Sequence, residues 1–172
     1  RHRDVHEDHV GREIPAGLLT VRDATISVVV AALVFVVAAG QLNPLCFWLS
    51  PLALAWVLFY SLTKRFTRWS HLVLGLGMGI APVGGYLAVT GAWSSPWWVL
   101  PALAAAVMTW GAGFDVLYAL QDLSFDRKHG LHSIPASLGV HTTFRISRAM
   151  HAATVGLLAI VVGEAVGLDR AG

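Results

Sequence analysis

Charged residues are scarce in this chain of 172 residues, making up 13% of the sequence where soluble globular domains carry about 25%. No Asp, Glu, Lys or Arg occurs between residues 24 and 63 or between residues 69 and 114. A membrane-spanning helix needs about 20 apolar residues, so each of these regions has room for two spans. With a mean hydropathy of +0.65, the composition excludes a disordered chain, a nucleic-acid-binding tail and an ordinary soluble domain. It predicts an integral membrane protein.

Cysteine is nearly absent as well. The one cysteine, Cys46, lies in an apolar stretch, which excludes a disulfide framework and a cysteine-based metal site. The first residues are polar and lack the pattern of a signal peptide. Because the chain also begins without Met, we expect it to be a piece of a longer protein.

Turn-forming residues divide the apolar regions into helices. The dipeptide Asn43–Pro44 and the segment 91–96 are turn signals, and a basic cluster starts at Lys64. We therefore predict an all-α fold, a multi-pass transmembrane helical bundle with about five spans in a single domain over 1–172. The expected spans are 24–42, 46–63, 71–90, 97–115 and 149–168. Five glycines in the third span favour close helix packing: Gly75, Gly77, Gly79, Gly84 and Gly85.

The distribution of positive charge predicts the orientation of the chain. If five spans cross back and forth, residues 1–23, 64–70 and 118–148 fall on one side of the membrane. That side then holds every Lys and Arg except Arg170. Basic residues gather in cytoplasmic loops, so we expect this side to face the cytoplasm, in a bacterial inner membrane.

One polar stripe carries most of the chemical information. On a continuous helix at about 100° per residue, Asp115, Tyr118, Asp122 and Asp126 lie within about 80° of one another. Asp122 and Asp126 repel each other, and an ionised Asp115 near the hydrocarbon core is costly. A Mg²⁺ ion that also binds substrate phosphates would remove both penalties. Alternatively, these carboxylates pair with nearby cations: Arg127, Lys128, Arg145 or Arg148.

A second pair lies at the cytoplasmic end of the second span. Tyr60 and Lys64 are four residues apart, so they share one helix face. Lys64 could meet a diphosphate as a point charge, with the phenol of Tyr60 hydrogen-bonding beside it. The alternative is an interfacial tyrosine next to a lysine whose ammonium reaches toward water.

These segments together resemble the UbiA-type intramembrane aromatic prenyltransferases. The stretch Asp115-x-x-Tyr118-Ala119-x-x-Asp122-x-x-x-Asp126, followed by Gly130–Pro135 and Gly139, resembles the second aspartate-rich motif of that family. The segment Tyr60-x-x-x-Lys64-Arg65 resembles its Tyr-x-x-x-Lys motif. The segment 12–17, beginning with Arg12, resembles the one that follows its first aspartate-rich motif. The order is that of the family, and the branch acting on 4-hydroxybenzoate, or its menaquinone-pathway relative, is the most similar.

The resemblance implies a Mg²⁺-dependent enzyme that transfers a polyprenyl group from polyprenyl diphosphate to an aromatic acid in ubiquinone or menaquinone biosynthesis. It implies a lipid bilayer as surroundings and no nucleic-acid partner. By motif position, Asp122 and Asp126 would bind Mg²⁺, and Asp115 would assist metal binding or steer the acceptor. Lys64, with Arg65 beside it, would bind the diphosphate. Tyr60 and Tyr118 would shape the pocket, and Arg12 would contact the acceptor carboxylate or the diphosphate.

The first aspartate-rich motif of the family, Asn-x-x-x-Asp-x-x-x-Asp, is not intact here. Asp4, eight residues before Arg12, is the better match to its last Asp, and Asp8 lies too close to Arg12. We therefore expect the family's first two helices, and those after residue 168, to lie outside this sequence. The first nine residues could instead hold a transition metal, although such mixed runs are usually solvated; the residues concerned are His2, Asp4, His6, Glu7, Asp8 and His9.

Two other functions stay open. Carboxylates within membrane spans also mark ion paths, which would make the chain a cation-coupled transporter with charge near the bilayer midplane and broken helices. A non-catalytic, truncated member of the family would keep only the fold. His129 and His132 lie in a loop near the aspartates, where we expect hydrogen bonding within the loop rather than metal binding.

Overall fold

The structure, a computed structural model, describes the backbone of residues 19–171 and the side chains of residues 19–167. Every regular element in this part of the chain is a helix, as the sequence predicts. The helices are α2 (Val21–Leu42), α3 (Pro44–Thr63), α4 (Ser70–Thr90), α5 (Val99–Tyr118), α6 (Leu123–Lys128) and α7 (Ile134–Ala171).

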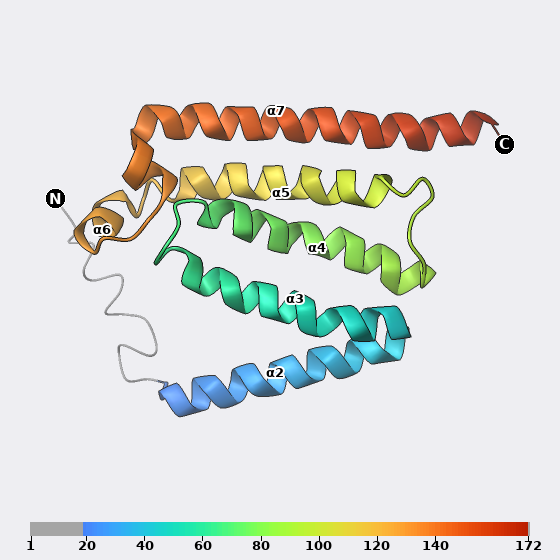
Figure 1. The fold of residues 1–172 in the computed structure, drawn as a ribbon, viewed down its shortest axis with the longest axis horizontal. Helices are drawn as coiled ribbons and strands as arrows, with labels where there is room; N and C mark the ends of the chain where they lie inside the picture. Colours follow the sequence, from blue (N-terminus) through green and yellow to red (C-terminus); the bar gives the residue numbers. More distant parts are fainter. Residues whose placement is uncertain (1–18, 172) are drawn as a thin grey trace.

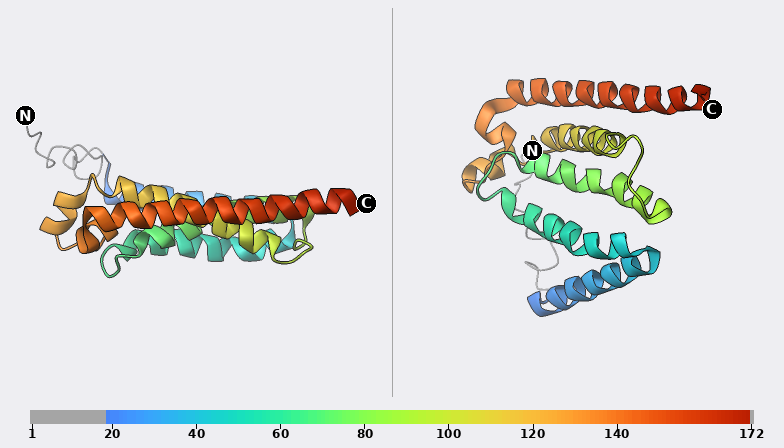
Figure 2. Two further views of the ribbon diagram at one scale, coloured as in Figure 1. Left: turned by 90° about the horizontal axis from the view of Figure 1, so that it is seen from above. Right: turned by 45° about the vertical axis from the view of Figure 1, so that its right-hand side comes forward.

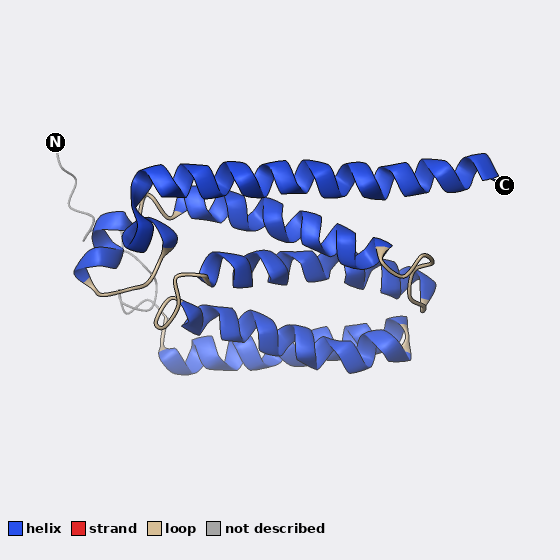
Figure 3. Cartoon of the chain, turned by 45° about the horizontal axis from the view of Figure 1, so that its top comes forward, coloured by secondary structure: helices blue, strands red, loops and turns tan. Residues whose placement is uncertain are grey.

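The five long helices lie side by side in the order α2, α3, α4, α5, α7, each packed against the next (Figure 1). Seen from above, they form a shallow layer, and the N-terminal end of α7 packs against α6 (Figure 2). The short helix α6 and the loops around it project beyond one end of the layer (Figure 3). We call this the α6 end. Residues far apart in sequence meet there.

Within the described part of the chain, five helices are long and apolar enough to cross a membrane. These are Val21–Leu42, Pro44–Thr63, Ser70–Thr90, Val99–Tyr118 and Ile134–Gly167. Their outer surfaces carry large exposed apolar side chains, such as Val89, which is 88% exposed. A helix satisfies its own backbone hydrogen bonds, so it can present such a surface to lipid. The make-up is that of an integral membrane protein, and the predicted fold class is confirmed.

The predicted turn at Asn43–Pro44 is present, and Asn43 fixes it. Its side-chain carbonyl accepts a hydrogen bond from the backbone N of Cys46 at 2.9 Å, which caps α3. Its amide nitrogen donates to the backbone O of Leu87 in α4 at 2.8 Å. One side chain therefore ends α2, starts α3 and holds both to α4.

The polar stripe does not lie on one continuous helix, so that prediction was wrong. Helix α5 ends at Tyr118, and the next residues form tight turns in which the backbone N of Gln121 donates to the O of Tyr118 at 3.0 Å. Helix α6 then begins with the backbone N of Asp126 donating to the O of Asp122 at 2.8 Å. The break redirects the chain across the α6 end.

The last span also differs from the prediction. Helix α7 begins at Ile134 rather than near residue 149, so much of the polar segment before residue 149 is helical. The start has a physical cause, because the Ser133 hydroxyl accepts from the backbone N of Ala136 and Pro135 lies in the first turn. Gly139, with φ of 78°, interrupts the helix and kinks it.

Two of the five glycines of α4 bring it close to α5. A Cβ atom at Gly75 would collide with the backbone O of Met108, and one at Gly79 would lie 2.6 Å from the backbone O of Ala104. Within the described residues, a Cβ at Gly84 or Gly85 would meet nothing within 4 Å. Close packing through small residues is therefore confirmed for the α4–α5 contact and does not extend along the whole helix.

Replacing Gly79 with Val should separate α4 from α5. Overpacking of a tight contact costs roughly 1–3 kcal/mol. We expect Gly79→Val to lower the melting temperature of the detergent-solubilised protein by several degrees. Gly84→Val, in the same helix and with the same change in helix propensity, is the matched control and should lower it less. Equal melting temperatures for the two variants would contradict the α4–α5 packing described here.

Candidate functional site

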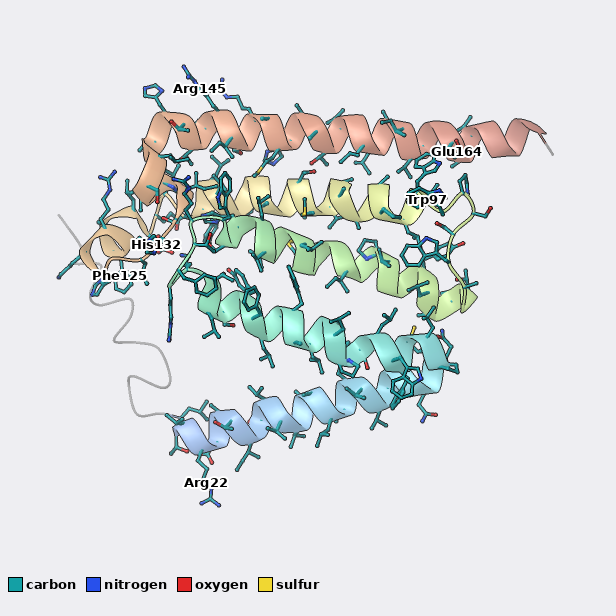
Figure 4. The ribbon with its side chains drawn as sticks, in the orientation of Figure 1. Arg22, Trp97, Phe125, His132, Arg145 and Glu164 are labelled. Carbon is teal, nitrogen blue, oxygen red and sulfur yellow. The ribbon has the colours of Figure 1, made fainter. Side chains whose placement is uncertain are left out.

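The polar residues predicted to be functional gather at the α6 end. In Figure 4, Phe125 and His132 mark this end, and Trp97 lies at the opposite end of the bundle. Arg22 and Arg145, at the near ends of α2 and α7, lie toward the α6 end too (Figure 4). Two of the basic residues expected to share one side of the membrane, Arg22 and Arg145, thus lie toward the same end of the bundle.

Lys64 lies between the two aspartates of the second motif. Its Nζ is 3.6 Å from Oδ2 of Asp122 and 3.9 Å from Oδ2 of Asp126. Asp122 is half exposed, whereas the side chain of Asp126 is 1% exposed. We call these three residues the Lys64 cluster. Lys64 balances the charge of the two carboxylates. On the sequence alone, only cations closer to the motif along the chain were considered for this role.

The buried carboxylate of Asp126 is not fully satisfied. Its Oδ2 is buried and has no hydrogen-bond partner, and the Lys64 ammonium is too distant to provide one. A buried polar atom without a partner costs about 1–3 kcal/mol, and more when it is charged. A ligand that reached this oxygen would supply the partner that it lacks.

Backbone hydrogen bonds hold the cluster together. Lys64 caps the C-terminal end of α3, and its carbonyl O accepts from the backbone N of His132 at 2.9 Å. The backbone N of Leu131 donates to the O of Asp126 at 2.9 Å. The loop after α6 is thereby tied both to the aspartate motif and to the end of α3, so the charged side chains meet in a fixed place.

Asp115 has a different partner. Its Oδ2 lies 2.6 Å from Nδ1 of His71, which sits in the first turn of α4 and is fully buried. Nε2 of the same ring lies 3.4 Å from the backbone N of Ile134, at the start of α7. His71 therefore joins α4, α5 and α7 through one side chain. The Asp115 side chain is 26% exposed, so it is still accessible from outside.

Two apolar grooves meet beside these residues. One, of about 210 Å³, lies between α3 and α4 and includes Tyr60; the other, of about 370 Å³, lies between α4 and α5 and includes Asp115 and Tyr118. Leu74 and Met78 line both grooves and form the wall between them. Each groove therefore combines an apolar surface with a polar side chain. In the first groove this is the phenol of Tyr60, and in the second it is the carboxylate of Asp115.

The remaining predicted site residues are less closely placed. Tyr118 is 58% exposed and packs its ring near Phe114, and Arg65 is exposed in the turn after α3. Asp4 and Arg12 lie outside the described residues, as does the histidine-rich start of the chain. Among residues 19–167, no group of three or more His, Cys, Asp or Glu side chains could hold a metal ion. The ring of His129 stacks on Phe125, as suits a loop histidine.

Sequence reasoning missed His71. It lies 44 residues from Asp115 in sequence, so no helical spacing connects the two. A signal was nevertheless present, because His71 begins an expected span that holds no Asp, Glu, Lys or Arg, and a group that can carry charge is costly in a membrane.

Comparison with known proteins shows which family this chain resembles. Over residues 1–169 the sequence matches the UbiA prenyltransferase family. The chain is 32% identical over 150 residues to a 4-hydroxybenzoate solanesyltransferase of Synechocystis sp., covering 86% of this chain and 49% of that protein. It is 32% identical over 152 residues to a 4-hydroxybenzoate octaprenyltransferase of Aromatoleum aromaticum, covering 87% of this chain and 50% of the relative.

A solved structure, the apo form of a UbiA homolog from Aeropyrum pernix K1, has the same fold with a TM-score of 0.84. The two are 37% identical, and the match covers 93% of this chain and 60% of that one. The chain spans about half the length of the curated relatives it matches. On the extent of the family match and of these identities, the chain belongs to the UbiA prenyltransferase family.

Proposed function

We propose that the full-length protein transfers a polyprenyl group from polyprenyl diphosphate to an aromatic acid of the 4-hydroxybenzoate type. The observation that carries the proposal is the Lys64 cluster, in which a buried Asp126 oxygen without a partner lies beside a second carboxylate and an ammonium. Membership of a prenyltransferase family supports it, as do relatives named for 4-hydroxybenzoate prenyl transfer.

The residues of the cluster fit a Mg²⁺ ion. Mg²⁺ prefers oxygen ligands and usually takes one or two carboxylates, leaving its other positions to water and substrate phosphates. Asp122 and Asp126 supply such carboxylates, and Oδ2 of Asp126 has no other hydrogen-bond partner. These two residues would hold the ion, which would neutralise charge on the departing diphosphate. Asp4 is a further candidate ligand by motif position.

Lys64 would contact the diphosphate directly. Its ammonium already lies within 4 Å of both carboxylates, so a diphosphate that bridges to the aspartates would come within its reach. A positive charge there favours breaking of the allylic carbon–oxygen bond, because negative charge collects on the leaving diphosphate. Arg65 follows in the same turn and would add a second positive charge.

The prenyl chain and the acceptor would occupy the apolar grooves beside the cluster. As the carbon–oxygen bond breaks, the allylic carbon gains cationic character and a ring carbon of the acceptor, ortho to its hydroxyl, bonds to it. The ring then loses a proton. Tyr60 and Tyr118, one at each groove, would shape the pocket at the reacting carbon, and Asp115 would steer the acceptor. Arg12 would contact the acceptor carboxylate or the diphosphate.

The product would be a prenylated aromatic acid for quinone assembly. The names of the relatives favour 4-hydroxybenzoate and the ubiquinone route, and a menaquinone-pathway acceptor is the second candidate. We further propose that the α6 end faces the cytoplasm of a bacterial cell, because Lys64 and the basic residues of α6 lie there, with Arg22 and Arg145 toward the same end.

A cation-coupled transporter finds less support. That function favours helices broken near the bilayer midplane. Helices α4 and α5 are continuous, and His71 and Asp115 lie in their first and last turns, respectively. A non-catalytic family member would have the same fold but would not transfer a prenyl group. A transfer assay therefore distinguishes it from the proposed enzyme.

Replacing either motif aspartate should abolish transfer. We expect Asp126→Asn and Asp122→Asn to lower kcat/KM at least 100-fold, because each removes a charged metal ligand while conserving side-chain size. The measurement is prenylation of 4-hydroxybenzoate by the full-length protein in liposomes. Asp23→Asn, at the exposed start of α2, is the matched control and should stay active. Unchanged transfer by Asp126→Asn would refute the proposed site.

Removal of divalent metal should have the same effect as removal of the carboxylates. We expect EDTA to stop transfer by the unmodified protein and added Mg²⁺ to restore it, because the diphosphate needs the ion's charge to leave. Ca²⁺ should restore less, since its larger, more flexible coordination suits the pair of carboxylates poorly. Full activity after exhaustive chelation would show that the reaction does not use the metal.

Neutralising Lys64 should weaken binding of the diphosphate. We expect Lys64→Gln to raise KM for polyprenyl diphosphate about 10- to 100-fold, because a charge-assisted contact is worth roughly 1.5–3 kcal/mol. KM for the aromatic acid should change much less. Arg22→Gln, at the exposed start of α2, also removes one positive charge and should leave both constants near those of the unmodified protein. Equal effects of the two variants would remove Lys64 from the site.

A further inference from the structure

A buried imidazole contacts Asp115. His71 is fully buried in the first turn of α4, and its two ring nitrogens have different partners. Nδ1 lies 2.6 Å from Oδ2 of Asp115, and the backbone N of Ile134 donates to Nε2 at 3.4 Å. A ring nitrogen that accepts a hydrogen bond carries no proton. The single proton of the neutral ring is then on Nδ1, where it can be donated to Asp115.

Ile134 is well placed to set this tautomer. It is the first residue of α7 and fully buried, and its neighbour Ser133 is buried as well. The loop before it is held at His132, whose backbone N donates to the O of Lys64. The N–H that faces Nε2 therefore comes from a fixed piece of backbone.

Asp115 is held on one side and open on the other. It lies in the last turn of α5, its Oδ2 takes the short hydrogen bond from His71, and its side chain also lines the groove that contains Tyr118. When a hydrogen bond holds one oxygen of a carboxylate, the other oxygen points in a fixed direction. At metal sites, the partners that orient a ligand side chain by a hydrogen bond contribute about 10- to 100-fold to affinity or activity, and we expect an effect of similar size here.

We propose that His71 is a positioning residue for prenyl transfer: as the neutral Nδ1–H tautomer set by the N–H of Ile134, it orients Asp115 toward the groove. This inference rests on the proposed function. His71 touches neither substrate in this role and acts only through Asp115. His71 also contacts the start of α7. Removing the two contacts one at a time therefore tests whether His71 orients Asp115 or only supports the fold.

Two substitutions separate the contacts. In His71→Asn the side-chain amide N–H can replace Nδ1–H at Asp115, and the contact to Ile134 is lost. In His71→Gln the longer side chain can place its carbonyl where Nε2 was, and the contact to Asp115 is lost. Ser70→Ala is the matched control, because Ser70 is the adjacent residue, is equally buried and has a hydroxyl without a hydrogen-bond partner.

The assay is steady-state transfer of octaprenyl groups to 4-hydroxybenzoate by the full-length protein in liposomes, with melting temperatures measured in parallel. We expect His71→Gln to lower kcat 10- to 100-fold with little change in KM for octaprenyl diphosphate. His71→Asn should retain kcat within about threefold, and Ser70→Ala should match the unmodified protein. In an Asp115→Asn background, His71→Gln should cause no further loss, because the two residues act as one unit.

The opposite order, with Gln active and Asn inactive, would show that His71 only anchors α7 and would overturn the proposal. Equal activity of all variants would overturn it too. Nitrogen-15 NMR of the labelled, unmodified protein provides a test that needs no variant to fold: a proton on Nδ1 supports the proposal, and one on Nε2 contradicts it. If the unmodified protein transfers no prenyl group at all, the proposed function fails, which is a result distinct from any order among the variants.

Discussion

A charged side chain at the edge of a membrane needs partners that the protein itself supplies, and this requirement organises the α6 end. In α2, α3, α4 and α5 the charged residues and His71 lie only in terminal turns or in the loops beyond them, whereas α7 also carries Arg145 and Arg148 within its length. The three carboxylates of the aspartate motif are each met by a residue from a distant part of the sequence. Asp115 is met by His71 and Asp126 by Lys64. The polar contacts between helices are thus also the contacts that assemble the candidate site.

The carboxylates of Asp115 and Asp126 differ in how their oxygens are hydrogen-bonded. A neutral imidazole at 2.6 Å orients Asp115 and adds no charge to the site. The Lys64 ammonium at 3.9 Å balances Asp126 and leaves one of its oxygens without a hydrogen bond. A carboxylate held by a short hydrogen bond suits orientation, whereas a buried carboxylate oxygen with no hydrogen-bond partner suits binding of a cation. This contrast favours separate roles for the two aspartates, with Asp126 binding metal and Asp115 steering the acceptor.

The sequence predicted the spans well because helices in a membrane follow from local composition. The breaks at Asn43 and Gly91 and the close approach at Gly75 and Gly79 depend on residue types that have few other uses in such helices. It did not predict the turn after Tyr118 or the early start of α7, since both depend on how the chain folds back over the α6 end. The His71–Asp115 pair was missed for the same reason. Its two members belong to different helices, and only their packing brings them together.

Lys64 shows why side-chain chemistry and backbone geometry cannot be considered separately here. Its ammonium faces the two aspartates, and its carbonyl accepts the hydrogen bond from the backbone N of His132. Two residues further along that loop, the N–H of Ile134 reaches His71. The loop after α6 therefore connects the groups that would bind diphosphate to the group that orients Asp115. A movement of this loop would alter the charge around Asp126 and the direction of Asp115 together, so metal binding and acceptor placement would be coupled through the backbone of residues 130–134.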